Sequence, residues 1–335
     1  MKAAVIGYGN VGMATFNALL HMPEIHELVL CGRNKEKIEG ELSDFKDSLA
    51  INTGIMTRIG GGGYEMAKNA DIIIYTAGPS IKNPKDDRMS IVKENVEVAR
   101  EVCYELNKYN RDAFMIVISN PVDVLVSAII NFTGRPRNKV IGTGTLLDTA
   151  RLRRYLAEML DIQPKDVTAF VLGEHGSTSF IVWDRTRVMG MKINAFLSSQ
   201  LGKNVKLSRL KLEGVTRRAG FHIVEMKGST SVGVAAAAAQ IVAAIIHDTH
   251  EILPISVSLE GEYGIDGIAL SVPCYVCATG AYVISGIKHS DEEHEALMAS
   301  AEHIRRNSEG LFESKFIDWV KSVWKISGTE TGDSY

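Results

Sequence analysis

The chain opens with AAVIGYGNVG (residues 3–12), an apolar run followed at once by glycines spaced as G-x-G-x-x-G. This spacing, with a helix-like stretch beginning near Val11, is typical of a strand that turns tightly into a helix. The glycines let the backbone approach a pyrophosphate, whose oxygens then accept bonds from the N–H groups at the helix start. The expected dinucleotide contacts of this turn are Gly7, Gly9, Asn10, Val11 and Gly12.

Working outward, short β-branched runs alternate with polar helix-like stretches through the first half of the chain. The runs are AAVIG, ELVLCG, ADIIIYTAG and AFMIVISNP. Apolar strands separated by helices predict an α/β fold, with a Rossmann doubly wound parallel sheet covered on both faces, which we place in residues 1–144. The run GGGG at 60–63 is expected to be a flexible connection.

The pattern changes after about residue 145. An amphipathic helix-like stretch, two strand-like runs, the small-residue helix VGVAAAAAQIVAAII and a charged helix from about Asp291 predict a C-terminal α+β domain that binds the substrate. We place this domain in residues 145–325 and expect residues 326–335 to form a polar tail.

The composition excludes several classes of partner. A net charge of −3 with scattered basic residues argues against nucleic-acid and membrane-surface partners, and the apolar runs are too short to span a bilayer. Four cysteines make no disulfide framework, so we expect a reducing compartment, the cytoplasm. Cys274 and Cys277 read as buried strand cysteines, and His247 and His250 as a solvated helix end, so no metal is expected.

The stretch LVLCGRNKEK (residues 28–37) lacks the acid that usually follows the second strand and binds the adenosine ribose. Gly32 takes that place, and Arg33 supplies a donor fork suited to a 2′-phosphate, with further contacts expected from Asn34 and Lys35. This favours NADP as the cofactor. The alternative is that Arg33 only stacks on the adenine and NAD is used.

In the second half, His175 lies in VLGEHG, where an apolar run ends between two glycines that allow close approach of a ligand. Asp148 and Arg151 are one helical turn apart and share a face. They form either an ordinary ion pair, or a carboxylate that orients an imidazole beside a guanidinium that binds a substrate carboxylate.

Five segments, GYGNVG, ISNPVDV, KVIGTGTLLDTARL, LGEHG and KGSTSVGVA, occur in the order found in the L-lactate dehydrogenase family, which the chain resembles from residue 2 to about 320. Within that family it most resembles the L-2-hydroxyisocaproate dehydrogenases. The resemblance implies reversible hydride transfer between a nicotinamide dinucleotide and a small-molecule 2-oxo or 2-hydroxy acid, by a homodimer or homotetramer.

The resemblance also implies residue roles. His175 would be the acid/base, Asp148 would fix its tautomer and raise its pKa, and Arg151 would bind the substrate carboxylate. Arg88 would polarise the reacting carbonyl from a closing loop over residues 79–90. The resemblance also places Ala77 and Gly78 beside the cofactor and Thr230 in the substrate pocket. Asn120 would lie between nicotinamide and substrate, with a cis peptide bond to Pro121.

Departures from the family pattern bear on the substrate. At the loop position that separates lactate-specific from malate-specific members stands either aliphatic Ile81 or basic Lys82. Ala219 and Gly220 leave room across the pocket. Together these features favour a 2-oxo acid with a medium-sized aliphatic or aromatic side chain. The alternatives are a malate dehydrogenase acting through Lys82, a plain L-lactate dehydrogenase, and more remotely a dinucleotide sensor without catalysis.

Overall fold

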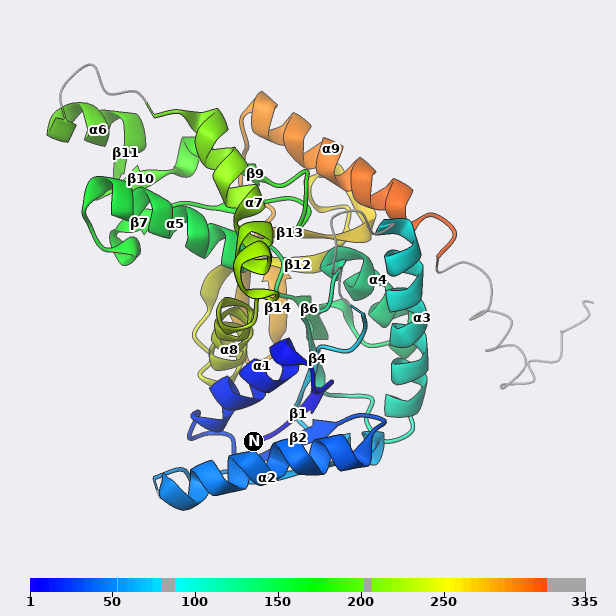
Figure 1. Cartoon of the computed structure of the whole chain (residues 1–335). Coiled ribbons are helices and arrows are strands. Elements are labelled where there is room, and N and C mark those ends of the chain that lie inside the picture. The colour runs from blue at the N-terminus through cyan, green and yellow to red at the C-terminus, as the bar shows by residue number, and fades with distance from the viewer. Residues whose placement is uncertain (53, 80–87, 202–206, 312–335) are drawn as a thin grey trace, which may run out of the picture.

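A computed structural model describes residues 1–52, 54–79, 88–201 and 207–311 (Figure 1). Its main sheet runs across both halves of the chain. In their order across the sheet, its strands are β14 (Gly280–Val283), β13 (Asp266–Cys277), β12 (Glu251–Glu260), β6 (Val140–Gly142), β5 (Phe114–Val117), β4 (Ile72–Tyr75), β1 (Lys2–Ile6), β2 (Glu27–Cys31) and β3 (Arg58–Gly62).

The six strands from β3 to β6 are parallel, in the order 3-2-1-4-5-6. The central ones are buried along nearly their whole length, as expected for apolar strands covered on both faces. Strand order reverses between β1 and β4, and ligands of such sheets bind outside the carboxyl ends of the strands at this point. The predicted Rossmann sheet is therefore confirmed.

The second half of the chain extends this sheet. Strand β12 pairs antiparallel with β6 through Ser256 and Gly142, and β13 and β14 follow as antiparallel neighbours. The C-terminal α/β part thus shares a sheet with the first half, a continuity that the sequence pattern did not indicate. The smaller sheets comprise β7 (Val167–Thr168), β10 (Arg187–Val188) and β11 (Met191–Lys192), and β8 (Val171–Leu172) with β9 (Phe180–Ile181).

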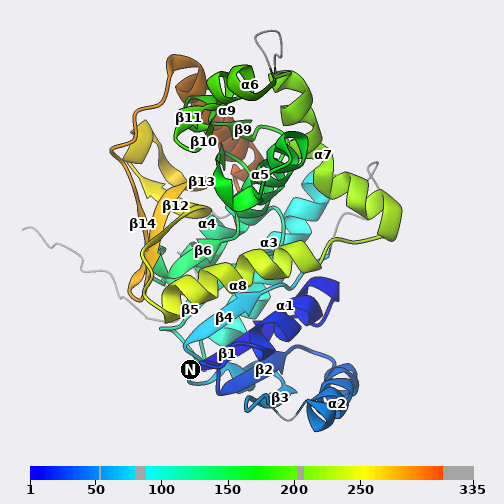
Figure 2. The same ribbon diagram turned by 90° about the vertical axis from the view of Figure 1, so that its left-hand side faces the viewer.

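Helices cover both faces of the main sheet. Helices α1 and α8 lie side by side in both views, and α3 packs against α4 on the opposite face (Figures 1 and 2). The helices are α1 (Asn10–Leu20), α2 (Lys35–Ile51), α3 (Arg88–Leu106), α4 (Val122–Thr133), α5 (Leu146–Leu160), α6 (Ile193–Leu201), α7 (Arg209–Lys227), α8 (Val232–Ile246) and α9 (Asp291–Ser308). Among the described residues, no helix is both long and apolar enough to cross a membrane.

The glycine run at 60–63 is not the flexible connection expected from the sequence. Residues 58–62 form β3, which pairs in parallel with β2. A Cβ on Gly61 would lie 2.7 Å from Ile38 and 2.8 Å from Leu42 on α2, closer than side chains tolerate. Gly61 therefore lets α2 pack directly against β3, the edge strand of the sheet.

Candidate functional site

The glycine turn joins β1 to α1 in the predicted conformation. Gly7 has φ +107, which favours glycine, and a Cβ on Gly12 would collide with the Gly7 carbonyl oxygen. Helix α1 begins at Asn10, so its first N–H groups point out of the turn. Asn10 also donates to Ser229 Oγ over 3.1 Å, connecting the turn to the segment before α8. This cradle fits the pyrophosphate of a dinucleotide.

Gly32 follows the last residue of β2 and lies against the ring of Tyr8. A Cβ at position 32 would clash with that ring. The Arg33 side chain is 76% exposed, with Nη1 3.8 Å from Glu101 Oε2. Arg33 and Glu101 also line a hollow of about 280 Å³ with Tyr64, Tyr104 and Glu105. The Asn34 side chain accepts a bond from the Lys37 N–H and caps α2, so its oxygen is already engaged.

The ends of β4 and β5 carry the next predicted cofactor positions. Gly78 has φ +119 and lies against Asn95, which donates to the Pro79 carbonyl. Ser119 Oγ donates to the Ala77 carbonyl over 2.7 Å and joins the two strand ends. Asn120 is exposed beside them, and the predicted cis bond to Pro121 is confirmed. Since β1, β4 and β5 are parallel, these segments share one edge with the glycine turn.

Three of the four predicted catalytic side chains lie together. His175 Nδ1 is 2.6 Å from Asp148 Oδ2, and Arg151 Nη1 donates to Asp148 Oδ1 over 3.0 Å. Asp148 and Arg151 are nearly buried, whereas the His175 side chain is 27% exposed. Asp148 holds Nδ1, so Nε2 is the ring nitrogen left for a substrate. The ion pair and the contact with the imidazole are therefore both present, one on each carboxylate oxygen of Asp148, and binding of a substrate carboxylate by Arg151 stays a prediction.

Backbone anchors fix the loop that carries His175. Gly173, with φ +92, exchanges two backbone hydrogen bonds with Ser271 on β13. The Glu174 N–H donates to Ser300 Oγ on α9 over 2.6 Å. Helix α5 is tied to β8, the strand that leads into this loop, through Thr149, whose Oγ1 accepts from the Val171 N–H at 2.9 Å. These bonds fix the loop that carries His175 relative to α5, the helix that carries Asp148.

The charges of this group shift its pKa values in opposite directions. Burial opposes protonation of His175, but the charge and hydrogen bond of Asp148 outweigh it, and the pKa of His175 is raised. Burial likewise favours neutral Asp148, yet the charges of His175 and Arg151 outweigh it and its pKa is lowered. The imidazolium–carboxylate pair is thus stabilised, as proton transfer through the imidazole requires.

Asp123 is a member of the site that was not predicted as such. It is 2% exposed, accepts the backbone N–H of His175 at 2.8 Å, and accepts Ser256 Oγ–H at 2.5 Å. Burial raises the pKa of its carboxyl to about 6, against the hydrogen bonds from Ser256 and His175. Asp123 lies in the first turn of α4, three residues after the exposed Asn120, and its side chain reaches the loop that carries His175. A carboxylate in the apolar sequence NPVDVLVSAII was the available signal.

The remaining predicted pocket residues divide into two groups. Arg151, Ala219 and Thr230 line one hollow of about 350 Å³ between α5, α7 and α8. A Cβ on Gly220 would lie 3.6 Å from Arg151 Nη1, so this glycine faces the guanidinium. Ile81 and Lys82 lie outside the described residues, as does most of the expected closing loop. Arg88 is the first residue of α3, and its side chain is also outside the described part.

Both halves of the chain match one family. Residues 1–142 match the lactate/malate dehydrogenase NAD binding domain, and residues 145–315 match the lactate/malate dehydrogenase alpha/beta C-terminal domain. L-lactate dehydrogenase 2 of Clostridium acetobutylicum is 36% identical over 315 residues, covering 94% of this chain and 98% of that protein. L-lactate dehydrogenase of Selenomonas ruminantium is 35% identical, covering 92% and 97%.

Solved structures agree with these relatives. The minor L-lactate dehydrogenase from Enterococcus mundtii, in its ligands-bound form, has a TM-score of 0.84 at 30% identity and covers 92% of this chain and 97% of that one. MGS-M5, a lactate dehydrogenase enzyme from a Medee basin deep-sea metagenome library, has a TM-score of 0.86 at 31% identity, with coverage of 92% and 98%.

Proposed function

The chain belongs to the lactate/malate dehydrogenase family, and on that premise we propose that it interconverts L-2-hydroxy acids and 2-oxo acids of medium-sized aliphatic or aromatic side chain. The observation that supports the proposal is the hydrogen-bonded group of His175, Asp148 and Arg151, in which the His175 ring is partly exposed to solvent. Homodimeric or homotetrameric assembly and a cytoplasmic location stay predictions of the sequence.

The chain's own residues account for the proton and for the substrate charge. In the reducing direction, His175 Nε2 gives its proton to the 2-oxo oxygen, and in the oxidising direction the neutral ring takes the hydroxyl proton. Asp148 holds the ring from Nδ1 and stabilises its charged form. Arg151 has one Nη1–H on Asp148, and its other N–H groups remain to bind the substrate carboxylate. Arg88 is proposed as the second guanidinium.

A nicotinamide dinucleotide, when bound, supplies and accepts the hydride of this reaction. The glycine turn would hold its pyrophosphate. Ala77, Gly78 and Asn120 border the place for its nicotinamide half, and Gly32 and Arg33 the place for its adenosine half. Since bound substrate and cofactor meet at the carboxyl edge of the sheet, His175 and Arg151 position the reacting carbon relative to the ring.

Substrate preference is tested by a panel of 2-oxo acids. We expect kcat/KM for 4-methyl-2-oxopentanoate and phenylpyruvate to exceed that for pyruvate about tenfold or more, since Gly220 leaves space facing Arg151. Initial rates for these acids and oxaloacetate, each with NADH and NADPH, give the comparison. A preference for pyruvate would contradict the size argument, and a preference for oxaloacetate would favour the malate alternative acting through Lys82.

The finer cofactor proposal is a preference for NADP(H), supported by Gly32 and exposed Arg33. One charge-assisted hydrogen bond of about 1.5–3 kcal/mol corresponds to about a tenfold to hundredfold preference. Arg33→Gln is expected to lower the NADPH/NADH ratio of kcat/KM by about that factor. Glu101→Gln is the matched variant, because Glu101 competes for Arg33 at 3.8 Å, and it should raise the ratio. Ratios unchanged in both variants would show that Arg33 does not bind a phosphate.

Asp123 is expected to set the pH range of the reaction as a positioning residue. Its charge helps to raise the pKa of His175, so Asp123→Asn should move the high-pH fall of kcat/KM for reduction to lower pH. Ser256→Ala, which removes a hydrogen bond from charged Asp123, should move the profile in the same direction by less. Superimposable pH profiles would contradict this role.

A stability measurement separates that effect from misfolding. The folded pKa of Asp123 lies above the ordinary value, so the folded state binds more protons between about pH 4 and 6. Stability contributed by this group therefore falls as pH rises through that window. Asp123→Asn removes the fall and should be at least as stable as the parent protein at pH 7, measured by urea unfolding.

A further inference from the structure

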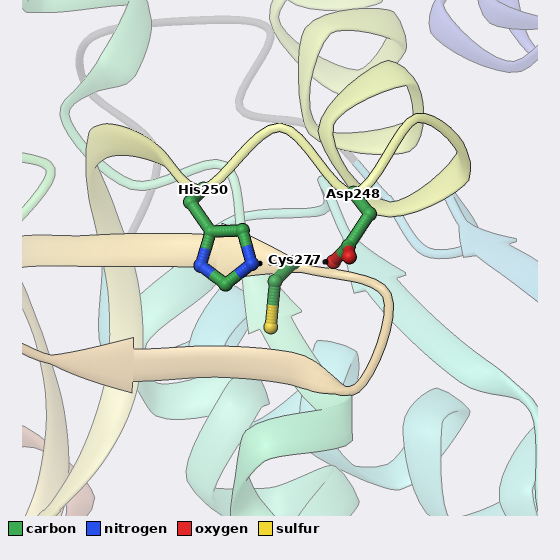
Figure 3. Close-up of side chains that lie close together, drawn as sticks. All are labelled: Asp248, His250 and Cys277. Atoms are coloured by element: carbon green, nitrogen blue, oxygen red, sulfur yellow. Dashed lines mark ion pairs between the residues drawn. The ribbon is translucent and has the colours of Figure 1, made fainter.

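Three side chains with metal-binding atoms converge at one end of the antiparallel strands β12 and β13 (Figure 3). Asp248 and His250 come from the segment between α8 and β12, and Cys277 ends β13. Glu251 pairs with Val276, so the segment before β12 lies beside the turn after β13. One ligand atom from each of the three lies within 4.8 Å of the other two.

We propose that Asp248, His250 and Cys277 form a zinc site with a fourth position open to water. Carboxylate oxygen, imidazole nitrogen and thiolate sulfur are the donors that Zn²⁺ prefers. At Zn–ligand lengths of about 2.0–2.3 Å, tetrahedral ligand atoms lie about 3.4–3.6 Å apart. His250 Nε2 and Asp248 Oδ1 are already 3.5 Å apart. The three ligand atoms lie within 4.8 Å of one another, so binding requires a side-chain movement that brings the sulfur closer to the other two.

Neighbouring groups contact each of the three proposed ligands, and in metal sites such contacts orient the ligands. The Ala278 N–H donates to Asp248 Oδ1 over 2.8 Å. The His250 ring stacks on Tyr275 with centroids 5.9 Å apart and an interplanar angle of 15°. Cys277 Sγ lies 3.2 Å from Thr279 Oγ1, which can donate to the sulfur once the thiol proton has left. The three ligands are thus partly oriented before metal binds.

Charge and exposure also suit a divalent cation. Cys277 is buried, whereas the side chains of Asp248 and His250 are 56% and 61% exposed and give the ion a path from solvent. Binding displaces the Cys277 thiol proton, and the thiolate and the Asp248 carboxylate then balance the two charges of Zn²⁺. The buried sulfur consequently enters a neutral complex.

The position of the site indicates a structural role. Ser256, the β12 residue bonded to Asp123, is five residues from Glu251, or about 17 Å along the strand. An ion held at Asp248 and His250 would join the α8–β12 segment to the turn after β13, away from His175. Removing the metal should therefore lower stability and leave the proposed dehydrogenase activity unchanged.

The test uses the full chain, stripped with a chelator and titrated with zinc chloride alone. We expect one Zn²⁺ per chain by calorimetry, and a rise in Tm of about 5 °C at a hundredfold excess over Kd. Cobalt(II) in place of zinc should give a thiolate-to-cobalt charge-transfer band. Absence of stoichiometric binding would overturn the proposal.

Conservative variants assign the ligands. Asp248 and His250 have φ of 51 and 55, a conformation that asparagine tolerates, so Asp248→Asn and His250→Asn remove a ligand with little backbone strain. Each, and Cys277→Ser, should weaken zinc binding at least tenfold, and Cys277→Ser should abolish the charge-transfer band. If Cys277→Ser does not fold, zinc binding by His250→Asn tests the site, because the His250 side chain is exposed and its replacement should not disturb folding.

His247→Asn is the matched control, because His247 lies three residues from His250 and faces Glu24 at 3.5 Å instead. It should keep the parent affinity. Binding that survives all three ligand substitutions, or that is lost with His247→Asn alone, would place the zinc elsewhere and overturn the assignment.

Discussion

Replacing His175 by asparagine is expected to lower kcat/KM for 2-oxo acid reduction about 10²- to 10⁴-fold, the usual contribution of a positioned general acid. Asparagine keeps the capacity to hydrogen bond with Asp148 Oδ2 but cannot exchange a proton near neutral pH. The substitution also leaves the hydrogen bond to Asp123 in place, because its donor is the backbone N–H of residue 175. The loss should therefore fall on proton transfer, measured as kcat with saturating substrate and cofactor.

The same residue predicts opposite pH dependences for the two directions. Reduction requires the imidazolium, so it should decline as pH rises through the pKa of His175, which Asp148 raises against the effect of burial. Oxidation requires the neutral ring and should increase over the same interval. In the asparagine variant, the residual rates should lack both limbs.

Two controls distinguish this loss from damage elsewhere. His294→Asn removes an exposed imidazole on α9, outside the hollow that contains Arg151, and should leave turnover unchanged. The dissociation constant of the dinucleotide, followed by fluorescence, should be almost the same in His175→Asn and the parent protein. Full activity in His175→Asn would remove the histidine from the mechanism.

The parts of the site that were predictable from sequence are those specified by local chemistry. The glycine spacing constrains a backbone turn within six residues, and Gly12 meets Gly7 as that spacing requires. Asp148 and Arg151 share a helix face because they are three residues apart. The encounter of Asp148 with His175 is a tertiary contact, and it was inferred from a family resemblance and not from spacing.

The parts that were missed depend on long-range packing. Asp123 reads as one polar residue in an apolar helix, and its role comes from His175 and Ser256, 52 and 133 residues away. The four glycines at 60–63 carry no apolar pattern, yet three of them belong to β3, and at Gly61 β2 and α2 leave no room for a side chain. The pairing of β6 with β12 is likewise invisible in sequence, because it is a contact between strands more than 100 residues apart.

Asp148→Asn is expected to lower kcat/KM at pH 7 about 10²- to 10³-fold, through two effects of removing one charge. His175 loses the carboxylate that raises its pKa, so its pKa falls and less imidazolium is present. Arg151, whose side chain is 11% exposed, also loses its counter-charge, and breaking such a nearly buried pair costs about 3–5 kcal/mol. The measurement is kcat/KM across pH, together with the urea midpoint of unfolding.

The pH response then separates a positioning role from a chemical one. Lowering the pH restores the imidazolium in Asp148→Asn, so reduction should recover in part on acidification, whereas His175→Asn has no ring to protonate and should not recover. Asp148→Glu, which keeps the charge on a longer side chain, should retain more activity at pH 7 than the asparagine variant. If Asp148→Asn lost stability but kept the parent pH profile, Asp148 would only hold Arg151 in the fold. The proton donor would then owe its raised pKa to other charges near the ring.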